Sequence, residues 1–187
     1  MTKILKTGEG YCILYKERGE DSEKIAPPGM AVLSRLDVPV PGIIAAADSA
    51  NRIRISDKRY CLVCQGRFDE EDGVMEDLLF HDSRSNRTFP VRRMRKGVKE
   101  ARLRYKVIRY NEEKDLSFVS VVLDTGRTHQ IRTQFASRKH PLAGDGKYGS
   151  RIKCPVALVC CELTFDEGEG TSSVTVKTDS ETELPEV

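Results

Sequence analysis

The chain has 187 residues, of which 39% are hydrophobic and 32% are charged, and its formal net charge is +2. This length supports one ordinary core, and the residue balance is that of a folded globular protein rather than a disordered chain. No apolar run approaches the roughly 20 residues that cross a bilayer, and the N-terminal stretch lacks the apolar segment of a secretory signal. We therefore expect a monomeric, cytoplasmic protein without membrane attachment, one domain over residues 1–187 whose polar tail at about 178–187 is loosely held.

The first third of the chain contains apolar runs at residues 11–15, 42–47 and 59–65, which predict strands. Before Gly42 the sequence V-P-V-P-G excludes a helix and favours a rigid extended turn, because each proline fixes its own backbone and restricts the residue before it. Asp37 therefore stands just ahead of a fixed loop.

Farther along the chain, residues 103–108 and 117–123 alternate between apolar and polar in the manner of strands, and the polar segment 111–115 joins them as a hairpin. Residues 128–137 predict a short helix that Thr128 could cap. A last strand pair is expected at 156–165 and 173–177. Strands thus outnumber helices in a single mixed domain.

Six cysteines raise the question of disulfides or a metal: Cys12, Cys61, Cys64, Cys154, Cys160 and Cys161. Cys61 and Cys64 form a C-x-x-C pair, but they lie in a predicted strand, and no second pair stands at zinc-ribbon spacing. We favour buried reduced thiols over a metal site.

Basic residues are concentrated between positions 84 and 109, where the only acid is Glu100. The cations of this run are Arg84, Arg87, Arg92, Arg93, Arg95, Lys96, Lys99, Arg102, Arg104, Lys106 and Arg109. Such clustering is typical of a phosphate-binding face, since several cations must neutralise adjacent phosphates. The alternative is a solvated basic strand pair on an ordinary surface.

The segment at residues 123–132, L-D-T-G-R-T-H-Q-I-R, combines a strand end, a glycine turn and the start of a helix. Its first helical turns carry Arg127, His129, Gln130 and Arg132. Free N–H groups and the positive end of the helix dipole make such a start a natural place for an anion. A capped surface helix is the alternative.

Two adjacent motifs, TGRTHQIR at 125–132 and HPLAGDGKYG at 140–149, resemble the signature of the RluA-type pseudouridine synthases. That family has TGR-x-HQIR followed by GHP-x-x-GD-x-x-YG. Other segments follow the family order: SRLD at 34–37 is similar to its HRLD motif, KRY at 58–60 to its K-x-Y strand, and GVKEA at 97–101 to its GKEA stretch. The resemblance covers residues 13–165.

The resemblance implies an α+β fold, one domain with a mainly antiparallel bent sheet and few short helices, crossed by an active-site cleft. It also implies isomerisation of uridine to pseudouridine in structured RNA, ribosomal or transfer, without a metal or an organic cofactor. Asp37 would be the nucleophile, Arg132 would pair with its carboxylate, and Tyr60 would stack on the target base and move a proton.

RNA contacts are expected from a second group of residues. The resemblance suggests that Arg35, Arg127, His129 and Gln130 shape the site and touch the RNA backbone, and that Arg35 fills the gap left by an extruded base. From the charge pattern we add Arg92, Arg93, Arg95 and Lys96 as phosphate contacts.

The chain departs from the family pattern beside the nucleophile. Ser34 replaces a histidine, Val40 and Pro41 replace Thr-Ser, and Val159 replaces another histidine. The segments 16–35 and 47–58 are too short for the helices usual there. These departures favour an alternative, an RNA-binding protein derived from such an enzyme that has lost turnover. The joint presence of Asp37, Tyr60 and Arg132 favours the enzyme, and a basic domain that binds a protein partner is a further alternative.

Overall fold

The computed structural model describes residues 3–167, 173–179 and 184–185. These residues form two compact units: unit 1 comprises Met1–Tyr60 and Leu158–Glu183, and unit 2 comprises Cys61–Ala157 and Leu184–Val187. That the whole chain is one domain stays a prediction. Of the polar tail expected at 178–187, residues 180–183 and 186–187 lie outside the described residues.

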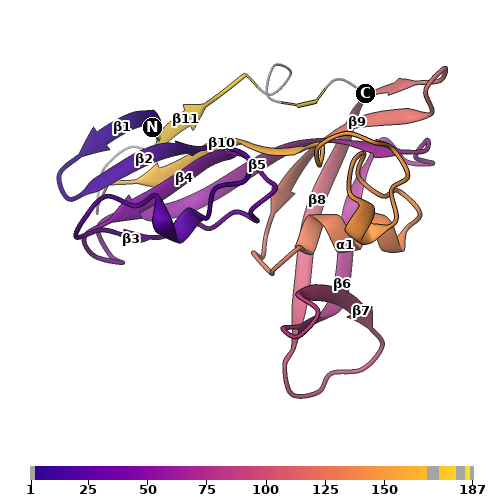
Figure 1. Cartoon of the computed structure of the whole chain (residues 1–187), viewed down its shortest axis with the longest axis horizontal. Helices are drawn as coiled ribbons and strands as arrows, with labels where there is room; N and C mark the ends of the chain where they lie inside the picture. The colour runs from indigo at the N-terminus through magenta and orange to yellow at the C-terminus, as the bar shows by residue number, and fades with distance from the viewer. Residues whose placement is uncertain (1–2, 168–172, 180–183, 186–187) are drawn as a thin grey trace. The chain divides into compact units, whose positions relative to one another are not determined.

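Unit 1 is built on a sheet with the strand order β1-β2-β4-β10-β5, in which β3 also pairs with β4 and β11 with β10 (Figure 1). Its elements are β1 (Lys3–Gly8), β2 (Tyr11–Lys16), the 3-10 helix η1 (Ser22–Lys24), β3 (Ala31–Val32), β4 (Gly42–Ala47), β10 (Leu158–Asp166), β11 (Val174–Lys177) and the first part of β5 (Arg54–Gln65). The strands expected at 11–15, 42–47 and 59–65 and the last strand pair are confirmed, although β5 begins earlier, at Arg54. β1 and β3 were not predicted, because one is rich in exposed polar residues and the other has only two residues.

The central strands of unit 1 are buried on both faces, which is why their sequences are continuous apolar runs rather than alternating ones. On one face Ile13, Ala45 and Phe165 belong to a single apolar cluster. On the other face Leu14 and Ile44 pack with Ile25, Met30 and Leu36 from the segment between η1 and β4. This packing anchors the segment that leads directly into Asp37.

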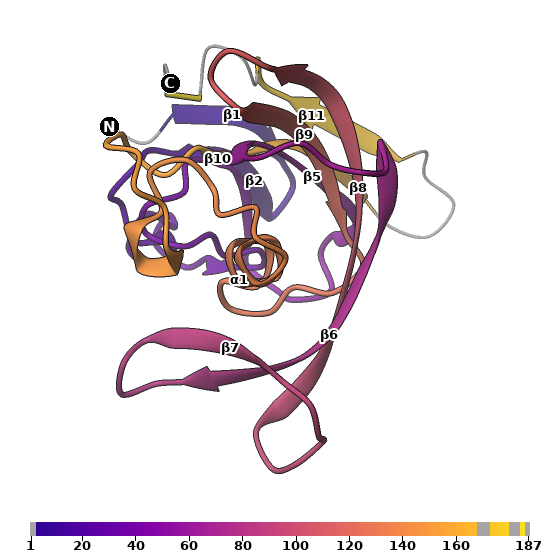
Figure 2. The ribbon, with the colours of Figure 1, turned by 90° about the vertical axis from the view of Figure 1, so that its right-hand side faces the viewer.

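Unit 2 has the strand order β5-β9-β8-β6-β7, and its single α-helix packs against β6 and β7 (Figure 2). Its elements are β6 (Asp72–Asp82), β7 (Arg87–Val91), β8 (Val98–Asn111), β9 (Leu116–Leu123), α1 (Gln130–Ser137), the 3-10 helix η2 (Gly146–Tyr148) and the end of β5. The predicted hairpin is confirmed as the antiparallel pair β8–β9. β6 was not predicted because four acidic residues interrupt its apolar positions, and β7 was not predicted because it has only five residues and contains a proline.

The start of α1 differs from the prediction that Thr128 caps it, which is wrong. The helix begins at Gln130, and the capping position is held by His129 in the left-handed conformation, with φ of 54° and no side-chain cap. Instead, the Gln130 side-chain oxygen accepts hydrogen bonds from the Arg127 N–H, at 3.0 Å, and from the Thr125 hydroxyl, at 2.8 Å. Within the described part of the chain, no helix is long and apolar enough to cross a membrane.

Candidate active site

Asp37 opens a tight turn in unit 1 whose backbone is held by hydrogen bonds at every carbonyl oxygen from Asp37 to Pro41. The Val40 N–H donates to the Asp37 oxygen at 2.9 Å and thereby closes the turn. The remaining bonds are Gly19 N to Val38 O (2.8 Å), Lys16 Nζ to Val38 O (3.2 Å), Arg18 Nη1 to Pro39 O (2.7 Å), Lys16 Nζ to Val40 O (2.8 Å) and Cys160 N to Pro41 O (3.1 Å). Because two of these residues are prolines, the turn is rigid in its dihedral angles as well, as the sequence predicted.

The residue that holds this turn from inside is Lys16, at the end of β2, whose side chain is fully buried. Its ammonium group donates to the carbonyl oxygens of Glu17, Val38 and Val40 at 3.1, 3.2 and 2.8 Å. Burial lowers the pKa of Lys16 to about 8, against the opposing effect of the nearby charges of Glu20 and Asp37. Sequence reasoning missed Lys16; the only signal was a lysine closing a strand that is otherwise apolar.

The burial of Lys16 should make the protein gain stability in mildly alkaline solution. The amine releases its proton near pH 8 in the folded chain but near 10.5 in the unfolded chain, so between these values the unfolded chain binds more protons. Below about pH 8 the folded chain bears the full free-energy cost of burying the charged amine. As the pH rises toward 10.5 this cost is removed, and the free energy of unfolding increases by roughly 3 kcal/mol. Urea unfolding across this window should show the gain for the wild type and a smaller gain for Lys16→Met. Equal gains would contradict this assignment.

Tyr60 lies on β5, in unit 1, and is only 5% exposed. Burial raises its pKa well above the ordinary value of 10.0, and the charges of Cys160 and Asp37 raise it further. The phenol therefore keeps its proton at neutral pH, and it lies within the electrostatic influence of the Asp37 carboxylate. Lys58, two residues earlier, has a pKa lowered by burial.

In unit 2, Arg132 forms a buried, two-pronged ion pair with Asp145. Its Nε and Nη2 atoms lie 2.7 and 2.8 Å from the two carboxylate oxygens, and the two side chains are 5% and 1% exposed. The guanidinium also lies over the ring of Tyr148, 5.1 Å from its centroid. Two parallel hydrogen bonds fix the plane of a guanidinium as well as its position. Asp145 was not among the predicted site residues, although it belongs to the GD pair of the second motif, and the expected pairing of Arg132 with Asp37 stays a prediction.

The other motif residues at the start of α1 are engaged within unit 2. His129 is buried, and its Nδ1 shares a hydrogen bond of 2.9 Å with the Tyr148 hydroxyl. Gln130 is buried too and donates to the Arg102 carbonyl at 3.1 Å. Arg127 is half-buried, with its Nε donating to the Glu100 carbonyl at 2.9 Å. Burial gives His129 and Gln130 a clear structural role, and their predicted contact with RNA stays a prediction.

The basic run at positions 84–109 contains cations that form ion pairs with carboxylates and cations for which the structure describes no carboxylate partner. Arg102 forms ion pairs with Glu76, at 2.8 Å, and with Asp124, and Arg104 pairs with Asp124 at 3.1 Å. Residues 92–97, between β7 and β8, are all exposed, as Arg102 and Arg104 are. Among the described residues, no carboxylate forms an ion pair with the predicted phosphate contacts in this loop, Arg92, Arg93, Arg95 and Lys96. In unit 1, Arg35 is exposed and pairs with Glu23 at 3.1 Å.

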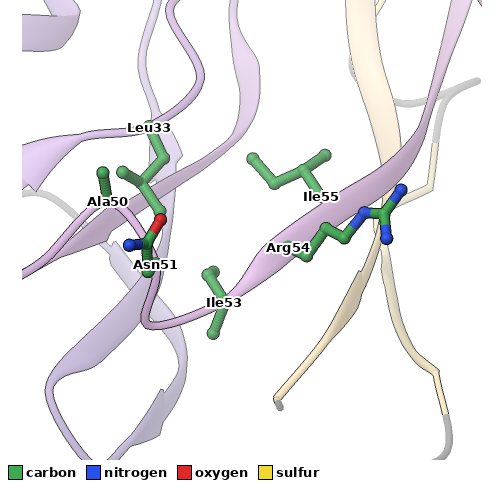
Figure 3. A pocket seen from close by; sticks show the side chains of 6 residues that line it. All are labelled: Leu33, Ala50, Asn51, Ile53, Arg54 and Ile55. Carbon is green, nitrogen blue, oxygen red and sulfur yellow. The ribbon is translucent and has the colours of Figure 1, made fainter. Parts of the chain in front are cut away.

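An open hollow of about 560 Å³ lies in unit 1 where β4 leads into β5 (Figure 3). It is lined by Leu33, Ala50, Asn51, Ile53, Arg54 and Ile55. None of the expected catalytic residues lines it, and its walls are mainly apolar, so we assign it no part in catalysis.

Relatives with curated descriptions align with large parts of the chain. An uncharacterized RNA pseudouridine synthase of Bacillus subtilis, YhcT, is 36% identical over 97 residues, which are 51% of this chain and 31% of that protein. The ribosomal large subunit pseudouridine synthase D of Borreliella burgdorferi is 28% identical over 166 residues, which are 81% of this chain and 48% of that protein. The chain thus spans less than half the length of these relatives.

Two solved human structures share the fold. RNA Pseudouridylate Synthase Domain Containing 1 superposes with a TM-score of 0.74 at 19% identity, covering 96% of this chain and 83% of that one. RNA Pseudouridylate Synthase Domain Containing 4 gives a TM-score of 0.73 at 15% identity, covering 98% and 88%. The expected fold class, a mixed and mostly antiparallel sheet with few helices, is confirmed.

The profile of one protein family, described as RNA pseudouridylate synthase, matches residues 14–137. The matched region contains Asp37, Tyr60 and Arg132 together with the TGRTHQIR motif. Because the match extends over more than half of the sequence, this chain belongs to the RNA pseudouridylate synthase family, as its motifs led us to expect.

Proposed function

We propose that this chain isomerises specific uridines to pseudouridine in structured RNA, ribosomal or transfer, with Asp37 as the nucleophile. The observation that carries the proposal is the turn that presents Asp37, whose backbone is held at every carbonyl from Asp37 to Pro41. A nucleophile that must approach one carbon of the ribose reacts faster when its backbone is immobile, because the entropy cost of positioning it has already been met during folding. The name of the Borreliella burgdorferi relative supports ribosomal RNA as one substrate class.

The reaction breaks the bond from N1 of uracil to C1′ of the ribose, turns the base, and joins C5 to C1′, while the hydrogen on C5 is released as a proton and N1 takes up a proton. A carboxylate can capture C1′ covalently, or it can help to remove a proton from the sugar, as carboxylates do at other glycosidic centres. Both routes place Asp37 at the sugar, and neither consumes a metal or a redox cofactor.

Tyr60 and Arg132 have supporting roles in this proposal. Since its pKa is raised, Tyr60 enters the reaction as a neutral phenol, suited to stacking on uracil and to passing on a proton when it receives another. Arg132 pairs with the Asp37 carboxylate in this proposal, and Asp145 fixes the plane of the Arg132 guanidinium. Extrusion of the nucleotide is least costly from a loop or bulge, and we propose that Arg35, whose side chain is exposed, fills the gap left by the base.

The departures from the family pattern are built into the fold around Asp37. The Ser34 hydroxyl accepts the Ala45 N–H at 3.0 Å and so ties the approach to Asp37 to β4. Val40 and Pro41 both accept hydrogen bonds that hold the turn. Val40 and Pro41 accept these bonds through backbone carbonyls, so the changed motif positions leave the turn that carries Asp37 intact.

The decisive experiment is tritium release from total cellular RNA labelled at C5 of uridine, since formation of the C5 glycoside must expel that hydrogen. We expect release by the wild-type chain. Absence of release from any RNA, combined with tight and salt-sensitive RNA binding, would replace the proposal with the RNA-binding alternative.

Joint replacement of Arg92, Arg93 and Arg95 by Ala should weaken RNA binding and flatten its dependence on salt. These cations are exposed, so each can release a counterion on meeting a phosphate, and the slope of log K against log salt concentration should fall by about two to three. Fluorescence anisotropy with labelled RNA over a salt series measures this slope.

The matched control is the double replacement of Arg102 and Arg104 by Ala. Both are already neutralised by Glu76 and Asp124, so the slope should remain close to that of the wild type. If the salt slope is unchanged in the triple variant, these three arginines do not contact RNA phosphates, and the RNA binds to another face of the protein.

A further inference from the structure

β7 forms the outer edge of the sheet in unit 2 (Figure 2). This strand also carries an exposed aromatic side chain. Phe89 on this strand is 39% exposed, and it is the one aromatic residue among the large hydrophobic side chains that the described residues expose. The guanidinium of Arg87, on the same strand, lies over its ring at 5.5 Å from the centroid. The edge therefore presents a flat ring and a flat cation to the solvent.

Phe89 and Arg87 lie at the surface end of a row of aromatic rings and guanidinium groups that continues to the buried residues Tyr148 and Arg132. Arg87 also lies 5.4 Å from the ring centroid of Tyr148, and Arg132 lies 5.1 Å from the same centroid. Tyr148 is 7% exposed and its hydroxyl accepts the Thr88 N–H at 2.8 Å, so the middle of the row is fixed. Arg87 and Arg132 thus both neighbour the ring of Tyr148, which links the exposed edge of β7 to the buried Arg132 through one fixed side chain.

The charge around Phe89 indicates the kind of partner. Among the described residues no carboxylate forms an ion pair with Arg87, and the exposed cations of residues 92–96 follow directly after β7. Apolar protein partners need a continuous apolar patch, whereas the exposed apolar residues here, Phe89, Pro90 and Met94, are interrupted by Arg92 and Arg93 and flanked by Arg87. Unpaired nucleobases stack on aromatic rings and on guanidinium planes, and their phosphates bind nearby cations.

We propose that Phe89 and Arg87 form a stacking surface for an unpaired RNA nucleotide, beside the phosphate-binding loop at residues 92–96. This inference rests on the proposed function and deepens it, because it specifies that the RNA substrate includes an unpaired, single-stranded nucleotide. The Phe89 ring stacks on a base, and Arg87 holds the ring in place and attracts the backbone.

A tryptophan introduced at position 89 gives a direct test, because the chain contains no tryptophan of its own. Fluorescence of Phe89→Trp should be quenched to saturation by an oligouridylate of about ten nucleotides, and much less by a duplex RNA of the same length. The control is Ile108→Trp, at a site on β8 that is 52% exposed, where the same oligouridylate should cause no saturable quenching. Absence of quenching at position 89, or equal quenching at both sites, would overturn the stacking surface.

Affinity provides a second measurement. Phe89→Ala should weaken oligouridylate binding about tenfold without changing the salt slope, since it removes stacking but no charge, and Phe89→Tyr should restore the affinity. A loss smaller than about twofold, or an equal loss in Phe89→Tyr, would contradict stacking. Ile108→Ala is the matched control, with wild-type affinity expected.

The outcomes separate this inference from the proposed function. Quenching at position 89 without tritium release by the wild-type chain would leave the stacking surface standing and end the assignment as an active synthase. Tritium release by the wild-type chain without quenching at position 89 would support the synthase and end the stacking surface alone.

Discussion

Replacement of Asp37 by Asn should abolish tritium release, by about 10⁴-fold or more, while RNA affinity stays within a few fold of the wild type. The amide keeps the shape of the side chain but loses the charge and the nucleophilic oxygen. The hydrogen bonds that hold the turn are accepted by backbone oxygens, which the substitution leaves in place. The fold and the RNA-binding surface should therefore survive, and only the chemistry should be lost.

Asp21→Asn is the matched control for this experiment. Asp21 caps η1 by accepting the Glu23 N–H at 3.1 Å, and asparagine caps a helix as well as aspartate does. This variant should turn over like the wild type. Turnover by Asp37→Asn near the wild-type rate would end the assignment of Asp37 as the nucleophile.

Replacement of Gly42 by Ala should destabilise the protein by about 3 kcal/mol or more and remove turnover with it. Gly42 has φ of +130°, and an added Cβ would lie 2.4 Å from the Cys160 carbonyl oxygen and 2.6 Å from its nitrogen. These are backbone atoms on β10, the partner of β4 at this position, so they cannot turn aside as a flexible side chain could. Since the Cys160 N–H also binds the Pro41 oxygen, separating the strands would loosen the turn that carries Asp37.

Urea unfolding and tritium release would measure both effects of Gly42→Ala. The control is Gly146→Ala, because an added Cβ at Gly146 meets nothing within 4 Å and the backbone there has no positive φ. Stability should change by no more than about 0.5 kcal/mol in this control. A comparably small change in Gly42→Ala would show that β4 and β10 separate without cost.

Much of the fold could be predicted from the sequence, because the spacing of apolar residues reports burial directly. β2 and β4 are apolar throughout because both of their faces are covered, and β8 alternates because one of its faces is exposed, whereas β9 is buried along most of its length. β6 escaped prediction because acidic residues such as Glu76 find their partners only across strands, and β7 because it has only five residues and contains a proline. Thr128 looked like a helix cap, but the left-handed backbone of His129 moved the helix start past it.

What the sequence by itself determined is the family, the fold class and the motif residues Asp37, Tyr60 and Arg132, because these depend on residue types in a fixed order. Only the tertiary structure showed that Lys16 holds the Asp37 turn, that Asp145 orients Arg132, and that Arg102 and Arg104 are already neutralised. The physical reason is that the partner of a buried charge or of a carbonyl group is often distant in the chain. Lys16 lies 24 residues from the Val40 oxygen it binds, and no local pattern records that contact.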